Sequence, residues 1–230
     1  MCGRYALNST PQKLARRFGA APPPGLQPRY NVAPSQNVLI VRRGGDGRRF
    51  ALVRWGLVPS WAKDIHFGGY STINARADTV AGKPAYRSAF RHRRAIIPAD
   101  GFYEWQAQAE VKVKQPWFIT LKDQEPMGFA GLWEHWTSPE GEELESCCII
   151  VTDANTLMRP IHDRMPVILD PADWDAWLDP EAKDLTALQS LLKPYPAEAM
   201  TAWPVGRQVN NPRHDAPDCL EPLASGSSAD

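Results

Sequence analysis

The sequence predicts a single α+β domain with a mostly antiparallel, barrel-like β core flanked by a few helices. Most of the apolar or alternating runs typical of strands lie in the middle of the chain. No linker and no internal repeat divides the 230 residues. Hydrophobic residues make up 43% of the chain and charged residues 23%, so the composition supports a sizeable core.

A first helix is predicted close to the N-terminus. Thr10 and Pro11 provide a cap and a first-turn proline, Leu14 and Phe18 supply apolar positions, and Gly19 ends the helix. The following residues 21–34 are rich in proline, so we expect them to be an extended segment over the surface, without regular structure.

Strands follow, beginning with a hairpin. Val38–Val41 and Phe50–Trp55 flank a glycine-rich turn at 44–47. Further strands are predicted at 94–97, 102–106, 117–121, 127–133 and 147–152.

The C-terminal third is predicted to return to helix. Helical patterns occur at 172–177 and 183–192, and a short run at 200–205 is expected to close the sheet. We expect one domain over 1–222 and a disordered small, polar tail over 223–230.

Charge and cysteine usage narrow the classes of partner. Lys and Arg total 26 and Asp and Glu total 26, so only a local basic face would bind nucleic acid; the densest basic run is 87–94. The cysteines at 2, 147, 148 and 219 lack CxxC spacing, so no structural zinc and no cofactor is predicted. The sequence shows no signal peptide and no membrane span, and we expect a reducing cytosol.

Cys2 is the first candidate for chemistry. A small residue after the initiator methionine permits removal of Met1, which would expose an N-terminal cysteine. Its amine titrates near pH 8, so amine and thiol are both nucleophiles at neutral pH. The pair can close a thiazolidine on an aldehyde, or the thiol can attack an amide with the amine as base. The position of Cys2 alone does not show which of these reactions occurs, or whether a cysteine follows Met1 by chance.

Three other segments offer polar groups. Glu104 lies among aromatic residues in GFYEW, where desolvation would raise its pKa. IHDRMP offers His162 for proton transfer and Arg164 for a phosphate. STINARAD offers Asn74 as a hydrogen-bond clamp and Arg76 as a second phosphate partner. Taken singly, each is more often a solvated or turn residue; together they form a complete set for opening and capturing a sugar aldehyde.

Eight ordered blocks carry a family resemblance over the chain from Met1 to about Pro222. They are MCGRY at 1–5, RYNVAPSQ at 29–36, RWGLVPSWAKD at 54–64, STINARADTV at 71–80, RRAIIPADGFYEW at 93–105, FAGLWE at 129–134, IHDRMPVIL at 161–169 and VNNPRHDAPDCLEP at 209–222. With these blocks the sequence resembles the SRAP family, the SOS-response-associated peptidases that shield abasic sites by DNA–protein crosslinking.

The resemblance implies a role for each of four residues. Cys2 would bond covalently to the ring-opened aldehyde of an abasic site through a thiazolidine. Asn74 would hold the opened sugar and the Cys2 backbone. Glu104 would be the general acid and base for the Schiff base, and His162 would assist ring opening.

The resemblance also implies the DNA contacts and the setting. Arg4, Arg76 and Arg164 would contact backbone phosphates, while Trp55 and Trp61 would lie in a DNA-facing or supporting region. The partner would be single-stranded DNA with an abasic site, bound by a monomer that joins the nucleoid during DNA-damage repair. The resemblance also allows AP-lyase activity and an autopeptidase activity that removes Met1, and the sequence leaves open whether strand cleavage accompanies crosslinking. General proteolysis is not favoured, because ordinary methionine removal already exposes Cys2.

Two other classes of function remain open from the sequence. An N-terminal-nucleophile cysteine amidohydrolase or peptidase would use Cys2 with His162. A non-catalytic single-strand binding module would depend on arginine and tryptophan side chains alone.

Overall fold

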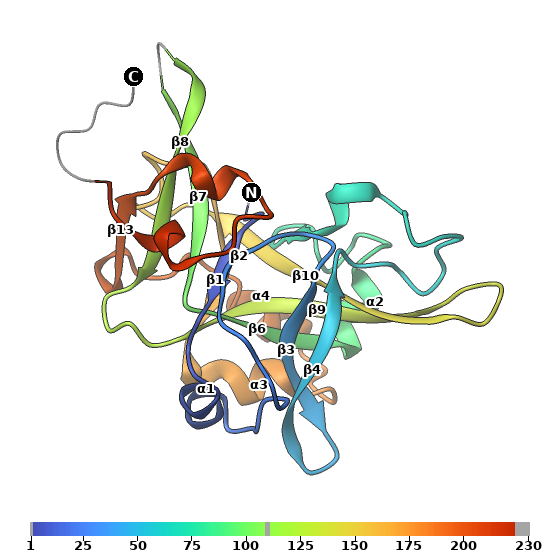
Figure 1. Ribbon diagram of the computed structural model, residues 1–230. Coiled ribbons are helices and arrows are strands. Elements are labelled where there is room, and N and C mark those ends of the chain that lie inside the picture. Colours follow the sequence, from blue (N-terminus) through green and yellow to red (C-terminus); the bar gives the residue numbers. More distant parts are fainter. Residues whose placement is uncertain (1, 109–110, 224–230) are drawn as a thin grey trace.

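The computed structural model describes residues 2–108 and 111–223, without the side chains of residues 70, 111 and 112. It consists of two β-sheets with short helices around them, as Figure 1 shows. Neighbouring strands are antiparallel except where β10 (Glu143–Asp153) runs parallel to β4 (Gly47–Trp55) and to β5 (Asn74–Arg76). The predicted α+β fold with a mostly antiparallel core is confirmed.

The larger sheet closes into a five-stranded barrel. Around the ring, β10 pairs with β4, β4 with β3, β3 with β6, β6 with β9, and β9 again with β10. The other three strands of the ring are β3 (Asn37–Gly44), β6 (Arg94–Ala99) and β9 (Met127–Thr137). Alternate side chains of a closed sheet point inward, so the apolar runs of these strands fill the barrel and no edge is left in the ring.

Three short strands extend the barrel. β5 and β11 (Arg164–Pro166) lie on either side of the C-terminal half of β10, and β12 (Ile168–Leu169) pairs with β9. The last residues of β10 therefore have neighbours that lie far away in the sequence.

A second, five-stranded sheet contains the N-terminal strand. Its order is β13–β8–β7–β1–β2, with bounds β13 (Met200–Pro204), β8 (Val111–Leu121), β7 (Gly101–Gln108), β1 (Tyr5–Leu7) and β2 (Arg29–Val32). The run predicted at 200–205 does join a sheet, as an edge strand antiparallel to β8.

The expectation that residues 21–34 lack regular structure is wrong at the C-terminal end of the segment. β2 forms there and pairs with β1, bringing Tyr5 opposite Val32. The prolines of the segment lie before β2 and, at Pro34, after it, so the backbone N–H groups of β2 itself remain available for pairing.

The helices are short and lie outside the sheets. α1 (Pro11–Phe18) matches its prediction: the Thr10 side chain accepts a bond from the Lys13 N–H, and Gly19 ends the helix with φ of 67°. The others are α2 (Arg87–His92), α3 (Trp174–Leu178) and α4 (Leu185–Ser190).

α2 was not predicted, since it falls in the basic run. That run is not wholly a surface. Arg94 is buried, and its guanidinium donates to carbonyl oxygens that include those of Phe90 and Trp177, both at 2.7 Å. This arginine therefore fastens α3 to the barrel.

Of the predicted tail, residues 224–230 lie outside the described part of the chain. Leu223 is described, and its N–H donates to the Pro204 carbonyl at 2.9 Å. Within the described residues, no helix is long and apolar enough to cross a membrane.

Candidate functional site

Cys2 and Asn74 meet just before β1. Cys2 is fully buried, and the Asn74 side-chain amide donates to its carbonyl oxygen at 3.0 Å. Asn74 begins β5, where pairing with Ile149 of β10 fixes its position. Its amide oxygen is buried and has no hydrogen-bond partner among the described residues, so the same side chain can still accept a bond from a ligand.

Glu104 enters the site from β7. A glycine is required at the start of this strand: a Cβ on Gly101 would lie 2.2 Å from the Phe118 ring and 2.7 Å from the Ile119 carbonyl oxygen. β7 can therefore lie close against β8, and Glu104 is 2% exposed. Burial raises the pKa of Glu104 to about 7, so protonated and ionised forms coexist near neutral pH.

His162 faces Glu104 from the turn before β11. The turn is closed by a bond from the His162 N–H to the Met158 carbonyl at 2.8 Å, and it places Nε2 of His162 3.9 Å from Oε2 of Glu104. Burial lowers the pKa of His162, which favours a neutral imidazole. The Arg164 backbone N–H donates to Nδ1 at 3.0 Å, and Nδ1 also lies 3.0 Å from Oδ1 of Asp163, so these contacts hold the ring with Nε2 on the Glu104 side.

The Cys2 thiol is held in its protonated form. Burial raises its pKa, and the nearby Glu104 charge raises it further. A cysteine protease depends on a low-pKa thiolate beside a cationic partner, and the surroundings of Cys2 have the opposite effect. The chemistry of the site is therefore that of a buried neutral thiol beside a proton-exchanging carboxyl.

Arg4 points away from β1 toward a C-terminal strap, residues 207–222. Its guanidinium donates to the Asn31 side-chain oxygen at 2.9 Å, to the Val209 carbonyl at 2.7 Å and to the Asn210 carbonyl at 3.3 Å. It also lies 6.0 Å from the Trp105 ring centroid. These bonds fix the orientation of Arg4 and leave only its remaining guanidinium N–H groups for another partner.

Arg76 and Arg164 lie on opposite neighbours of β10, and each is paired with an acid. Arg76 bonds to Asp78 through Nε at 3.0 Å and Nη2 at 2.6 Å. Arg164 forms an ion pair with Asp153. The two aspartates were not singled out from the sequence; the spacing Arg76-x-Asp78 was the available sign for one, and the pairing of Asp153 depends on β10–β11 register.

The two tryptophans of the RWGLVPSW block lie in different surroundings. Trp55 is 1% exposed, and its indole N–H donates to the Ile73 carbonyl at 3.0 Å. It cannot stack on a base from this position, so a DNA-facing role is excluded in this conformation and a supporting one remains. Trp61 is 57% exposed and packs edge-on against Phe67, with ring centroids 4.9 Å apart.

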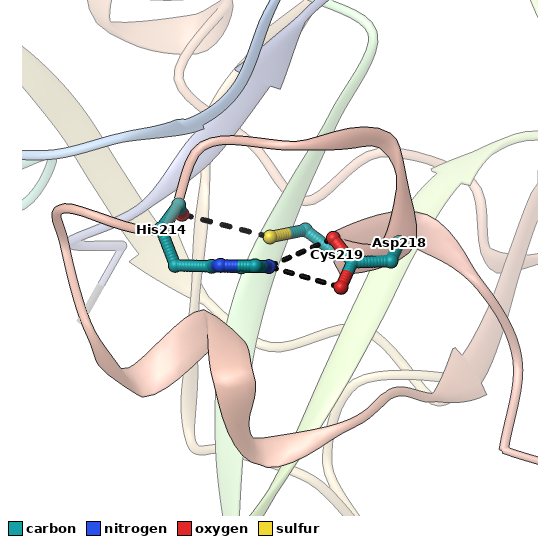
Figure 2. A group of neighbouring side chains, drawn as sticks. All are labelled: His214, Asp218 and Cys219. Carbon is teal, nitrogen blue, oxygen red and sulfur yellow. Dashed lines mark hydrogen bonds and ion pairs between the residues drawn. The ribbon is translucent and has the colours of Figure 1, made fainter.

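The strap carries a group of side chains with metal-ligand chemistry, drawn in Figure 2: His214, Asp218 and Cys219. The His214 ring nitrogen Nε2 lies 2.8 and 3.0 Å from the two Asp218 carboxylate oxygens. The Cys219 thiol donates to the His214 carbonyl at 3.7 Å. These bonds join residues 214, 218 and 219 within the strap, so the cluster is explained as a structural contact that holds this part of the strap together.

Two further side chains anchor the strap, and sequence reasoning missed both. The Asn31 amide donates to the carbonyls of Val209, Asn211 and His214. The Asp215 carboxylate accepts from the N–H groups of Tyr30 and Asn31 in β2. Asn31 lies in the block at 29–36 and Asp215 in the block at 209–222, and this was the signal by which the sequence could have identified them.

Four side chains from distant parts of the chain therefore lie close together: Cys2, Asn74, Glu104 and His162. Arg164 follows His162 closely in the same segment. These four side chains form a buried polar site next to the β-barrel, with a cysteine from the second position of the chain. The family model described as SOS response associated peptidase (SRAP) matches residues 1–212. The chain belongs to this family.

Curated relatives match nearly the whole chain. The abasic site processing protein YoqW of Bacillus subtilis (strain 168) is 46% identical over 224 residues, covering 96% of this chain and 99% of the relative. The abasic site processing protein HMCES of Xenopus tropicalis is 33% identical, covering 96% of this chain and 78% of the relative. A crystal structure of a protein from Bacteroides thetaiotaomicron superposes with a TM-score of 0.86 at 28% identity, covering 97% of this chain and all of that one.

Proposed function

We propose that this protein processes abasic sites by bonding Cys2, exposed after loss of Met1, to the sugar aldehyde of an abasic site in single-stranded DNA. The observation that carries the proposal is the convergence of Cys2 with Asn74 and of Glu104 with His162, from four separate segments. The relatives named as abasic site processing proteins support the same substrate. Met1 itself lies outside the described residues.

The reaction begins with opening of the sugar. A hemiacetal opens when its ring oxygen gains a proton and its hydroxyl loses one. The neutral His162 ring and the Glu104 carboxyl, with its pKa of about 7, supply the two halves of that exchange. The buried oxygen of the Asn74 amide accepts a bond from a sugar hydroxyl and holds the opened chain beside Cys2.

The amine of Cys2 then attacks the aldehyde carbon to give a carbinolamine. Protonated Glu104 gives its proton to the departing hydroxyl, water leaves, and an imine forms. The neutral thiol adds to the imine carbon, the S–H proton passes to the imine nitrogen by way of the Glu104 carboxylate, and a five-membered thiazolidine closes. No oxidant or metal is needed for the balance.

A preference for unpaired DNA follows from access. The aldehyde must reach a fully buried cysteine, which a partner strand would obstruct. The exposed Trp61 ring offers a surface for stacking a neighbouring base of any sequence. Arg76 and Arg164 would contact phosphates once their aspartates are displaced.

The test is a denaturing gel of the protein mixed with an abasic single-stranded oligonucleotide at neutral pH, with the undamaged oligonucleotide as control. A band shifted by the mass of one protein is expected only with the abasic strand. An unshifted band would overturn the proposal. The intact mass of the purified protein, expected to lack Met1, establishes that the amine is available.

The same samples separate the other two classes of function. A cysteine amidohydrolase would turn over an amide and form an acyl-enzyme without DNA, which the raised thiol pKa of Cys2 opposes. A non-catalytic binding module would retain all its activity after Cys2→Ala.

A further inference from the structure

The sheet register brings two arginines and an aspartate onto one face beside the candidate site. Arg76 of β5 lies opposite Val151, and Arg164 of β11 lies opposite Asp153, two residues further along β10. Residues opposite each other on neighbouring strands share a face, and so do residues i and i+2 of one strand. Arg76, Asp153 and Arg164 therefore project from the same face.

Each guanidinium is already occupied by a carboxylate. Asp78 takes the Nε and Nη2 donors of Arg76, which form one of the two edges suited to a bidentate phosphate. Asp153 binds Nη1 of Arg164. The groups also act on one another across the face, since the pKa of Asp78 is lowered by its bond with Arg76 and further by the charge of Arg164.

Acidic and basic groups alternate on this face. Asp78, Asp153 and Asp163 lie beside Arg76 and Arg164, the positive charge of Lys114 also acts on His162, and His162 is neutral because burial lowers its pKa. A DNA strand approaching the site therefore meets carboxylates already bound to the cations that it needs. Phosphate can bind these donors only by displacing them.

We propose that Asp78 and Asp153 are specificity-determining residues, which occupy Arg76 and Arg164 in the absence of DNA and so weaken binding to undamaged single strands. The inference rests on the proposed function, because it assigns phosphates to the two arginines. An undamaged strand is held only by non-covalent contacts, so competition from the two aspartates lowers its affinity in full. A strand with an abasic site is retained by its covalent bond, so the competition improves discrimination.

The exchange is physically accessible. The Arg76 and Asp78 side chains are 47% and 55% exposed, and such solvated pairs hold together weakly. A phosphate that bonds to two N–H groups of a guanidinium can take the place of the carboxylate. The displaced carboxylate is then solvated, so the exchange leaves no charge buried. The carboxylates therefore act as a threshold rather than as a permanent block.

The experiment measures equilibrium binding of a labelled undamaged single-stranded oligonucleotide, which has no aldehyde, by fluorescence anisotropy, with Cys2→Ala in every variant to remove the reactive thiol. Asp78→Asn and Asp153→Asn are each expected to bind about two- to five-fold more tightly, which corresponds to the loss of one exposed ion pair. The gain should shrink as salt increases, because salt screens both the pair and the phosphate contacts.

The matched control is Asp175→Asn. It raises the net charge by the same amount, but Asp175 lies on α3 and pairs with Arg43 and Arg48 of the β3–β4 hairpin. The affinity of the Asp175→Asn variant for the undamaged oligonucleotide should change less than that of either site variant. Arg76→Ala should abolish the gain from Asp78→Asn, since the cycle isolates the coupling between the two side chains.

Unchanged or weaker binding by both site variants would overturn the inference, because the aspartates would then orient the arginines for phosphate. If thermal unfolding shows that Asp78→Asn disturbs the fold, Asp78→Ser replaces it and the same criterion applies. Crosslinking by the protein with Cys2 intact is measured in parallel. Failure to crosslink contradicts the proposed function, whereas normal crosslinking without an aspartate effect contradicts only this inference.

Discussion

Nε2 of His162 lies 3.9 Å from Oε2 of Glu104. This distance is too long for a direct hydrogen bond, and it is short enough for one oxygen atom to contact both groups. A sugar oxygen or a carbinolamine hydroxyl placed between them would touch a carboxyl with a pKa of about 7 and the imidazole Nε2 at once. The geometry thus favours proton transfer through the substrate over a structural ion pair.

The first prediction concerns the pH dependence of folding stability. The pKa of Glu104 is raised from an ordinary 4.5 to about 7, so the folded chain binds more protons than the unfolded chain between these values. The contribution of Glu104 to stability is therefore fully present below pH 4.5 and is lost as pH rises through about 7. Glu104→Gln stays neutral and is expected to be the more stable protein at pH 8, by on the order of 3 kcal/mol. Denaturant unfolding of both proteins from pH 4.5 to 8.5 measures this difference, and parallel curves would contradict it.

The second prediction separates the amine of Cys2 from its thiol. Cys2→Ser and Cys2→Ala keep a small second residue and hence the N-terminal amine, but neither can close a thiazolidine. Both are expected to give an adduct with an abasic strand only when borohydride traps the imine, whereas the wild-type adduct should survive heating without reductant. Denaturing gels with and without borohydride make the comparison. A heat-stable, unreduced Cys2→Ala adduct would show that another nucleophile reacts.

The third prediction concerns the two contacts of Asn74. Its amide donates to the Cys2 carbonyl while its oxygen is left to accept from the substrate. Asn74→Asp has acceptors only, and it would also set a carboxylate against the Cys2 carbonyl. We expect crosslinking to slow by about ten- to a hundred-fold, as for loss of a positioning contact of ~1.4–2.8 kcal/mol. Single-turnover crosslinking rates at saturating DNA provide the measurement.

Thr72→Ser is the control variant for Asn74→Asp, and thermal unfolding compares the stability of the two variants. Thr72→Ser changes a buried side chain of the same segment while keeping its hydroxyl, which bonds to the Gly69 carbonyl. Its crosslinking rate should stay near that of the wild type. Equal slowing in both variants would point to general loosening of the segment instead of a contact with the sugar.

The parts of the fold with local signals were predictable from the sequence. α1 has its cap, its proline and its terminal glycine within ten residues, and the β3–β4 hairpin has its turn at 44–47. β2 and β5 have no such signals. β2 follows a proline run, and β5 has three residues whose partner strand lies more than 70 residues away. Their pairing depends on tertiary contacts that no short window contains.

The site residues were identifiable as types, and their surroundings were not. Burial of Glu104 was expected from its aromatic neighbours and is present. In contrast, Trp55 and Trp61 belong to one block, yet the first is in the core and the second is on the surface. The difference arises because Trp55 ends β4 in the barrel whereas Trp61 lies in the loop beyond it. The aspartate partners of the arginines were missed because charge counting does not show which charges are already paired.

The final prediction assigns DNA stacking to Trp61 and not to Trp55. Trp61→Ala removes an exposed ring that touches Phe67 but belongs to no larger buried cluster, so folding should change by less than about 1 kcal/mol. Affinity for undamaged single-stranded DNA should fall by about five- to a hundred-fold if a base stacks there, and Trp61→Phe should restore most of it. Trp55→Phe serves as the contrasting variant: it loses the indole bond to the Ile73 carbonyl and leaves a cavity, so it should lower the free energy of unfolding by about 1–3 kcal/mol. Anisotropy and denaturant unfolding on the same four proteins distinguish the two roles, and unchanged affinity in Trp61→Ala would contradict stacking at this ring.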